Sequence, residues 1–273
     1  MKTIIIGKNS NLSSFLSKEL DNTICLSSRD LLSNISVLAT YINHSVNIIF
    51  NNFQPATKLS DISNTEDYII NSIGITSKVL DFCKSNSMKI NKIIYTSSSS
   101  VYGNNILCNE KDELKPMNLH ASLKLANEKL IEKFCFDNNI DYTITRVFNM
   151  YGGNDNFSVI SKIINAYKLN DNLTIVNNGN AIRDFIHIDD VVEIYMKLLK
   201  VKDIKIINVG TGKGSSIKSI IDSLYNHNKK LKTSNIFRDE LKISTSDNRV
   251  LLNKLKKENF IKVEHYVQKE LNI

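Results

Sequence analysis

Short apolar runs alternate with helical spacing over the first 150 residues, and this alternation constrains the fold more than any other feature. β-Branched and aromatic residues gather in five runs, which we predict as strands at 2–6, 23–26, 46–50, 92–96 and 140–146. Helical spacing of apolar residues occurs at 11–20, 33–43, 62–85 and 118–138. This alternation predicts a doubly wound parallel sheet with helices on both faces, which binds ligands at the carboxyl ends of its strands.

The alternation changes after about residue 150, where loops become longer. We predict strands and helices there at 157–169, 173–177, 183–187, 189–200, 205–209 and 215–226. The pattern indicates a smaller α/β lobe that is interleaved with the end of the sheet. We therefore expect an α/β protein with two domains, residues 1–150 and residues 151–273.

Composition excludes several classes of protein. The 273 residues are 42% hydrophobic, which is enough for a full core, and no apolar run approaches the ~18–20 residues of a membrane span. The four cysteines form no CxxC pair and the five histidines have no ligand-like spacing, so we expect free thiols and no metal site. The net charge of +7 follows a lysine-rich composition along the whole chain. We expect a cytoplasmic protein without nucleic-acid or membrane partners.

Residues 7–13, GKNSNLS, join the first predicted strand to the first predicted helix. A dinucleotide-binding fingerprint has glycine at positions 7, 10 and 13 of such a turn, and only Gly7 remains here. Ser10 and Ser13 are small, and a serine can cap a helix while its hydroxyl meets a phosphate. We expect Gly7, Ser10, Asn11 and Leu12 to contact a dinucleotide; the alternative is an ordinary strand–turn–helix.

Residues 25–30, CLSSRD, follow the second predicted strand. No acidic residue stands at the strand end to bind a ribose 2′-hydroxyl, whereas Arg29 is placed to accommodate a 2′-phosphate. This favours NADP(H) over NAD(H) as cofactor; the alternative is a surface arginine.

Four polar motifs follow one another along the chain: TSSSSVYG at 96–103, RVFNMYG at 146–152, RDFIHIDDV at 183–191 and NVGTG at 208–212. With these motifs in this order, the chain resembles the extended short-chain dehydrogenase/reductases, the sugar-nucleotide epimerase/dehydratase family, over nearly its whole length. The resemblance implies a Rossmann-type domain over residues 1–150 and a sugar-nucleotide-binding lobe over residues 151–273. It also implies a homodimer formed through the helices at about 62–85 and 118–138.

The resemblance assigns roles to individual residues. Ser98 would hydrogen-bond the sugar oxygen that is oxidised or reduced, and Lys124 would hold the nicotinamide ribose and lower the pKa of its neighbouring acid/base. Asn149 and Arg183 would contact the diphosphate of the substrate, for which a fork-shaped guanidinium is suited. Arg249 is placed either to reach a substrate phosphate or to lie on the surface.

The 4,6-dehydratases of this family carry an Asp-Glu pair just after the serine or threonine. Ser99 and Ser100 take those places here, so dehydration is not expected. Ser99 is instead expected to contact the substrate.

His120 departs from the family pattern. It lies in the predicted helix PMNLHASLKLANEKL, residues 116–130, four residues before Lys124, where the family has the catalytic tyrosine of its YxxxK pair. Three interpretations follow: His120 replaces the tyrosine as acid/base, water or Tyr102 supplies the proton, or the redox chemistry has been lost. A histidine can do such work because its pKa lies near neutrality.

We therefore expect an NAD(P)-dependent reductase or epimerase that acts on a nucleoside-diphosphate (deoxy)sugar in polysaccharide biosynthesis. The family uses the same acid/base pair for both reactions, so both stay open. The alternative is a catalytically impaired protein that binds a dinucleotide or a sugar nucleotide.

Overall fold

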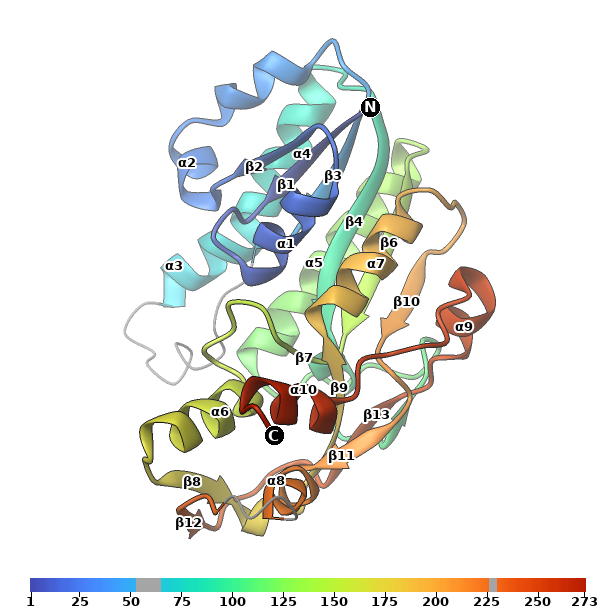
Figure 1. Ribbon diagram of the computed structural model, residues 1–273. Coiled ribbons are helices and arrows are strands. Elements are labelled where there is room, and N and C mark those ends of the chain that lie inside the picture. The colour runs from blue at the N-terminus through green and yellow to red at the C-terminus, as the bar shows by residue number, and fades with distance from the viewer. Residues whose placement is uncertain (53–64, 226–229) are drawn as a thin grey trace. The chain divides into compact units, whose positions relative to one another are not determined.

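The computed structural model describes residues 1–52, 65–225 and 230–273, and the chain divides into two compact units (Figure 1). Unit 1 comprises Met1–Gly103, Leu114–Arg146 and Tyr195–Ile207. Unit 2 comprises Asn104–Glu113, Val147–Ile194 and Asn208–Ile273. The chain therefore passes between the units several times, and each unit is assembled from segments that are distant in sequence.

A six-stranded sheet lies at the centre of unit 1, in the order β10-β6-β4-β3-β1-β2. Its strands are β1 (Lys2–Ile6), β2 (Thr23–Leu26), β3 (Val46–Phe50), β4 (Ile90–Ser98), β6 (Asp141–Val147) and β10 (Ile206–Val209). Strand β1 pairs in parallel with both β2 and β3, and β3 pairs in parallel with β4. The predicted parallel α/β fold is confirmed, and the first three strands have the predicted bounds.

Helices of unit 1 connect these strands (Figure 1). They are α1 (Asn11–Glu19), α2 (Ser28–Ser33), α3 (Thr65–Ile69), α4 (Ile75–Ser85) and α5 (Leu119–Asp137). A π-helical turn, Ile70–Gly74, joins α3 to α4. Residues 62–64 of the predicted helix lie outside the described residues.

The helix predicted at 33–43 is present in part, as a shorter 3₁₀ helix. Helix α2 ends at Ser33, and a 3₁₀ helix follows over Ile35–Tyr41. Asn34 separates them with φ −141° and ψ 89°, and its side-chain oxygen accepts a hydrogen bond from the Ser36 amide at 3.2 Å. An asparagine that bonds the backbone in this way begins a new turn and does not continue the old helix.

The core of unit 1 is built from the faces of these strands and helices. Every residue of β3 is buried, and so are Ile4 and Ile6 of β1. Leu80 and Cys83 of α4 and Ile131 and Cys135 of α5 pack into the same cluster. Burial of apolar side chains on this scale is the main stabilising term of such a domain.

Unit 2 has a five-stranded sheet with the order β11-β9-β13-β5, on which β7 pairs with β9. Its strands are β5 (Leu107–Cys108), β7 (Asn149–Tyr151), β9 (Ile182–His187), β11 (Gly214–Ser216) and β13 (Ile243–Ser246). A second, two-stranded sheet pairs β8 (Leu173–Val176) with β12 (Thr233–Ile236) in parallel.

The described residues of this second part of the chain form the α-helices α6 (Val159–Leu169), α7 (Ile188–Leu198), α8 (Ile217–Tyr225), α9 (Arg249–Leu255) and α10 (Val263–Glu270). Helix α7 contributes residues to both units. Residue 226 of the helix predicted at 215–226 lies outside the described residues.

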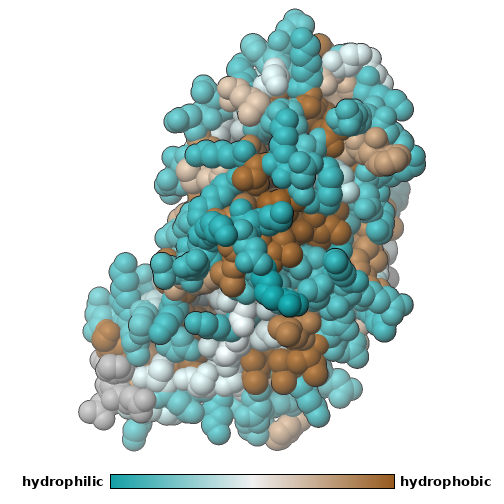
Figure 2. Space-filling model, turned by 90° about the vertical axis from the view of Figure 1, so that its right-hand side faces the viewer, coloured by the Kyte–Doolittle hydropathy of each residue, from teal (hydrophilic) through white to brown (hydrophobic). Residues whose placement is uncertain are grey.

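The surface mixes polar and apolar groups. The face drawn in Figure 2 is covered mainly by hydrophilic side chains, between which apolar ones show in patches. This mixture is ordinary for a folded protein. Within residues 1–52, 65–225 and 230–273, no helix has the length and apolar character needed to cross a membrane.

Candidate active site

The turn between β1 and α1 is tight and packs closely against the neighbouring strands. Gly7 has φ +113°, and a Cβ added there would lie 2.3 Å from the backbone oxygen of Asn51, so only glycine fits. The Gly7 amide donates to the Leu26 carbonyl at 2.9 Å, which fixes the turn against the end of β2. The turn at Gly7 thus lies close against the backbone that follows β3 and the end of β2.

Ser10 is the N-cap of α1, where its Oγ accepts a hydrogen bond from the Ser13 amide. Asn11 is the first residue of the helix, and Leu12 follows it with 1% of the residue exposed. The first turn of a helix has N–H groups without intrahelical partners and a positive electrostatic end. The four predicted residues therefore surround one helix terminus that suits a phosphate.

Asn51 belongs to the same cluster and was not predicted. It follows β3, is 3% exposed, and its Nδ2 donates to Ser10 Oγ and Ser13 Oγ, each at 2.8 Å. Arg29, the other predicted cofactor contact, lies in the first turn of α2 and is exposed.

Lys124 is held firmly between α5 and β4. Its Nζ donates to the Thr96 carbonyl at 2.7 Å and lies 5.2 Å from the centroid of the Tyr95 ring. The side chain is nearly enclosed, with 8% of the residue exposed. Burial lowers the pKa of Lys124 to about 8, while the Glu128 carboxylate acts in the opposite direction.

His120 lies one turn before Lys124 in the first turn of α5, which begins at the N-cap Asn118. Its Nε2 atom is buried and has no hydrogen-bond partner among the described residues. Burial first, and the Lys124 charge second, lower the pKa of His120 to about 4. The imidazole is therefore neutral at pH 7. A buried nitrogen without a partner is rare enough to require an explanation.

Ser98 ends β4 and begins a 3₁₀ turn, Ser99–Tyr102, in which its Oγ accepts from the Ser100 amide at 3.2 Å. Ser98 and Ser99 are both half-buried. Gly103 closes the turn with φ +65° beside the backbone of Lys115. The predicted hydroxyl run is thus a structured turn that follows directly from the central strand.

A buried ion pair lies beneath this turn. Glu128 and Arg146 are 1% and 2% exposed, and the guanidinium donates to both carboxylate oxygens, at 2.8 and 3.3 Å. Ser97 also donates to Glu128, and Arg146 donates to the Tyr102 hydroxyl at 3.0 Å. The turn that carries Ser98 is therefore held to α5 at Ser97 and to β6 at Tyr102. Because Tyr102 is fully buried and bonded to Arg146, its place favours a structural role.

The predicted substrate contacts Asn149 and Arg183 lie in unit 2. Asn149 Nδ2 donates to the Asp184 carbonyl at 3.2 Å, and Arg183 pairs with Glu240 at 3.4 Å. The Asp184 carboxylate is fully buried and accepts from Thr211, Gly212 and Ser246 at 2.6–3.1 Å. Asp184 thereby holds the NVGTG turn against β9 and β13.

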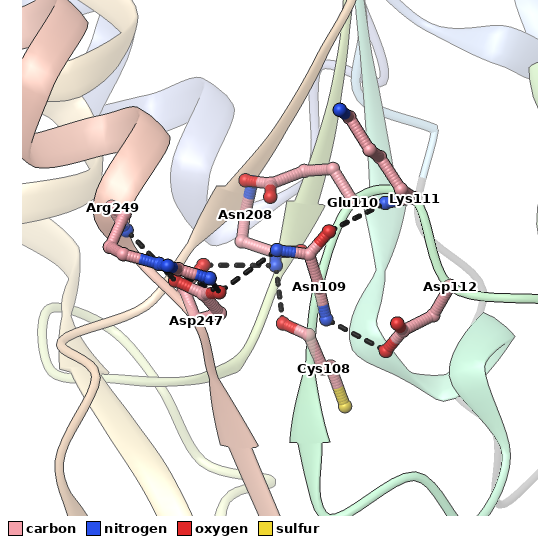
Figure 3. A network of polar contacts seen from close by, with 8 residues as sticks. All are labelled: Cys108, Asn109, Glu110, Lys111, Asp112, Asn208, Asp247 and Arg249. Atoms are coloured by element: carbon pink, nitrogen blue, oxygen red, sulfur yellow. Dashed lines mark hydrogen bonds and ion pairs between the residues drawn. The ribbon is translucent and has the colours of Figure 1, made fainter.

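Arg249 is fixed by its neighbour Asp247 (Figure 3). Its Nε lies 2.9 and 3.1 Å from the two Asp247 oxygens, and 77% of the Arg249 side chain is exposed. Hydrogen bonds from Arg249 hold the pKa of Asp247 well below its usual value. Asn109 donates to the same carboxylate at 2.9 Å, and Asn208 donates to the Cys108 and Asp247 carbonyls (Figure 3). Arg249 is therefore oriented on the surface of unit 2.

No group of three or more His, Cys, Asp or Glu side chains that could hold a metal ion occurs in the described part of the chain. The features at hand are thus the capped N-terminus of α1, a buried histidine–lysine pair, and arginines in unit 2.

Comparison with known proteins gives one consistent family. Residues 5–210 match the model of the NAD dependent epimerase/dehydratase family. A putative UDP-glucose 4-epimerase of Methanocaldococcus jannaschii is 31% identical over 160 residues, which cover 56% of this chain and 51% of that protein. An ADP-L-glycero-D-manno-heptose-6-epimerase of Brachyspira hyodysenteriae is 30% identical over 205 residues, which cover 70% of this chain and 62% of that protein. The matched region thus spans little more than half the length of these relatives.

Solved structures share the fold at low sequence identity. MoeE5 in complex with UDP-glucuronic acid and NAD has a TM-score of 0.88 and 22% identity, covering 100% of this chain and 98% of that one. UDP-glucuronic acid 4-epimerase from Bacillus cereus, in complex with UDP-glucuronic acid and NAD, has a TM-score of 0.85, 22% identity and the same coverage. The fold, the order of the motifs and the family model agree: the chain belongs to the NAD-dependent epimerase/dehydratase family of the extended short-chain dehydrogenase/reductases.

Proposed function

We propose that this protein is an NAD(P)-dependent epimerase or reductase of a nucleoside-diphosphate sugar, in which His120 carries out the proton transfer. One observation carries the proposal. The buried Nε2 of His120 has no hydrogen-bond partner among the described residues. His120 lies one helical turn from Lys124, whose ammonium donates a hydrogen bond to the Thr96 carbonyl. A titratable nitrogen kept without a partner beside a fixed cation is an arrangement typical of a reaction centre.

The residues at the N-terminus of α1 fit a dinucleotide. Gly7 permits the close turn, Ser10 caps the helix, and the helix end favours the pyrophosphate charge. The bound nicotinamide would supply the chemistry of accepting or returning a hydride. Lys124 would hold its ribose, as the family resemblance implies. NAD in the related structures supports this type of cofactor.

The balance of the reaction requires a proton acceptor, and we assign this role to His120. When a sugar alcohol is oxidised, its carbon loses a hydride and its oxygen loses a proton, which leaves a ketone. A neutral imidazole with a pKa of about 4 can accept this proton. The resulting imidazolium is a strong acid beside Lys124, so it returns the proton readily when the ketone is reduced. Ser98 would hydrogen-bond the same sugar oxygen and hold it in place.

The choice between NAD and NADP rests on Arg29. Its exposed place at the start of α2 is compatible with a 2′-phosphate contact, which supports NADP. The related structures named above contain NAD, which supports the other choice. A chain that uses NAD as a recycled cofactor would be an epimerase, whereas NADPH consumption would indicate a reductase.

We assign substrate binding to Ser99, Asn149, Arg183 and Arg249. The two related structures hold UDP-glucuronic acid, and a guanidinium binds a diphosphate through paired hydrogen bonds. Arg183 is 19% exposed and shares its charge with Glu240, so the ligand would compete with that carboxylate.

A second candidate function is binding without redox chemistry. The low pKa of His120 favours it, because a group with a pKa of about 4 is a weak base at pH 7. Two glycines of the fingerprint are also replaced, by Ser10 and Ser13.

The test is turnover of a panel of UDP-, GDP-, ADP- and dTDP-sugars, followed through nicotinamide absorbance and sugar product. His120→Ala and His120→Tyr are compared with wild type, and His265→Ala, an exposed histidine on α10, is the matched control. We expect His120→Ala to lower kcat by about 10²-fold or more and His265→Ala to leave it unchanged. Higher turnover by His120→Tyr would show a retired centre and favour the binding function.

We also propose a homodimer formed through α4 and α5. Apolar side chains are exposed at the end of α5, where Phe136 is 81% exposed, and in the π-helical turn that precedes α4, where Ile70 is 39% exposed. Sedimentation of the wild type and of Phe136→Ser tests this, and a monomeric wild type at assay concentration would contradict it.

A further inference from the structure

The hydroxyl oxygen of Ser10 accepts two hydrogen bonds from neighbouring residues. Its Oγ accepts from Asn51 Nδ2 at 2.8 Å and from the Ser13 amide at 3.4 Å. A hydroxyl has two acceptor lone pairs and one donor hydrogen. Because both lone pairs are engaged, only donation remains, and no residue in the described ranges accepts that hydrogen. The hydroxyl hydrogen of Ser10 is therefore available to an acceptor outside this cluster, at the N-terminus of α1.

Asn51 controls this arrangement. Its two amide hydrogens go to Ser10 Oγ and Ser13 Oγ, both at 2.8 Å, so the amide group has no third hydrogen to give. Its backbone amide donates to the Ile6 carbonyl at 2.8 Å, and its backbone oxygen excludes any side chain at Gly7. Asn51 thus contacts all three positions at which a dinucleotide fingerprint has glycine.

We propose that Asn51 is a positioning residue that turns Ser10 into a hydrogen-bond donor to the pyrophosphate of the dinucleotide. This rests on the proposed function, since it concerns the same cofactor. In a glycine fingerprint the backbone itself approaches the pyrophosphate closely. Here a side-chain hydroxyl supplies a bond to the phosphate in place of that approach, and Asn51 directs its hydrogen. The two serines are then a rebuilt phosphate site, not a lost one.

A merely structural Asn51 is the competing explanation, because a buried amide also fills space and satisfies two serines. The two explanations differ in their coupling to Ser10. If Asn51 acts through the Ser10 hydroxyl, removal of Asn51 has little further effect once Ser10 has become alanine. If Asn51 only supports the fold, the two substitutions weaken binding independently.

The experiment is isothermal titration of the full chain with NAD, NADPH and ADP-ribose, which share the pyrophosphate. The variants are Ser10→Ala, Asn51→Ala, Asn51→Asp and Ser10→Ala/Asn51→Ala. Asn51→Asp keeps the size of the side chain and removes both donors. Asn47→Ala is the matched control: Asn47 lies on β3, the strand that Asn51 follows, is also 3% exposed, and accepts one hydrogen bond from Asn91 at 2.9 Å. Thermal melting of every variant separates lost binding from lost folding.

We expect Ser10→Ala and Asn51→Ala each to raise the dissociation constant of every probe about 10- to 100-fold, the range for a hydrogen bond to a charged group. The double variant should bind as Ser10→Ala does, and Asn47→Ala should stay within about twofold of wild type. Affinity for a sugar nucleotide should not change in Asn51→Asp.

Wild-type affinity in Ser10→Ala would overturn the proposal, even if Asn51→Ala fails to fold. Additive losses in the double variant would overturn it as well, because they would show that Asn51 acts without Ser10. If wild type binds neither NAD, NADPH nor ADP-ribose, the proposed function itself fails, and this outcome is distinct from wild-type binding that Asn51 does not influence.

Discussion

The protonation of His120 is the property on which the proposed chemistry depends most. Its pKa of about 4 in the folded chain lies below the ordinary 6.5, chiefly because of burial and secondarily because of Lys124. A difference of this size corresponds to ~3 kcal/mol in favour of the neutral imidazole. The unfolded chain then binds more protons than the folded chain between these two pKa values. The free energy of unfolding should therefore fall as the pH drops from 6.5 to 4, by up to about 3 kcal/mol.

Two measurements check this prediction. The imidazole resonances of His120, assigned by comparison with His120→Gln, give its pKa directly. Urea unfolding between pH 4 and 7 should show a steeper loss of stability in wild type than in His120→Gln, because the variant has no imidazole to protonate. In Lys124→Met the pKa should rise only part of the way toward 6.5, since burial is the larger cause. An imidazole that titrates near 6.5 in wild type would refute the reasoning.

Three further predictions concern the residues around the site. Glu128→Ala should lower the free energy of unfolding by about 3–5 kcal/mol in urea titrations, because it leaves the buried Arg146 charge unpaired; a loss below about 1 kcal/mol would contradict the buried pair. Gly7→Ala should weaken dinucleotide binding at least about tenfold in calorimetry, since its Cβ would meet the backbone oxygen of Asn51, and unchanged affinity would contradict the tight turn. Activity should fall as the pH rises through about 8, where Lys124 loses its charge, and a rate that stays level to pH 10 would contradict the role of this ammonium.

Much of unit 1 could be predicted from local patterns. The runs Lys2–Ile6 and Val46–Phe50 are β-branched or aromatic at nearly every position, and each is followed by a residue that ends it. Strands buried on both faces have this composition. Helix α5 begins at its capping residue Asn118 and carries Lys124 and Glu128 into the interior at helical spacing.

Some short strands of unit 2 could not be predicted in this way, although β8 and β9 lie where strands were predicted at 173–177 and 183–187. Strand β11 is Gly-Ser-Ser, and β12 is Thr-Ser-Asn-Ile with all four residues exposed. Such segments have no apolar periodicity, and they become strands only because a partner strand is close to them in the fold. Tertiary context decides their structure.

The partners of the site residues also lie beyond local patterns. Asn51 is 41 residues from Ser10 and 38 from Ser13, and Glu128 is 31 residues from Ser97. The sequence identified both serines as replacements of glycine, but it gave no sign of the amide that orients them. Arg249 is the opposite case: its partner Asp247 is two residues away, so this pair could have been found by inspection.

The central claim is that the chain uses a nicotinamide dinucleotide, and direct titration of the purified protein with NAD, NADH, NADP and NADPH tests it, after a check for cofactor carried through purification. The proposal predicts saturable binding of at least one of the two cofactor pairs, NAD/NADH or NADP/NADPH. Tight NADPH binding would support the contact of Arg29 and a reductase, and tightly held NAD or NADH would support an epimerase. If none of the four binds, the chain does not use a nicotinamide dinucleotide, and His120 has no catalytic role of the kind proposed.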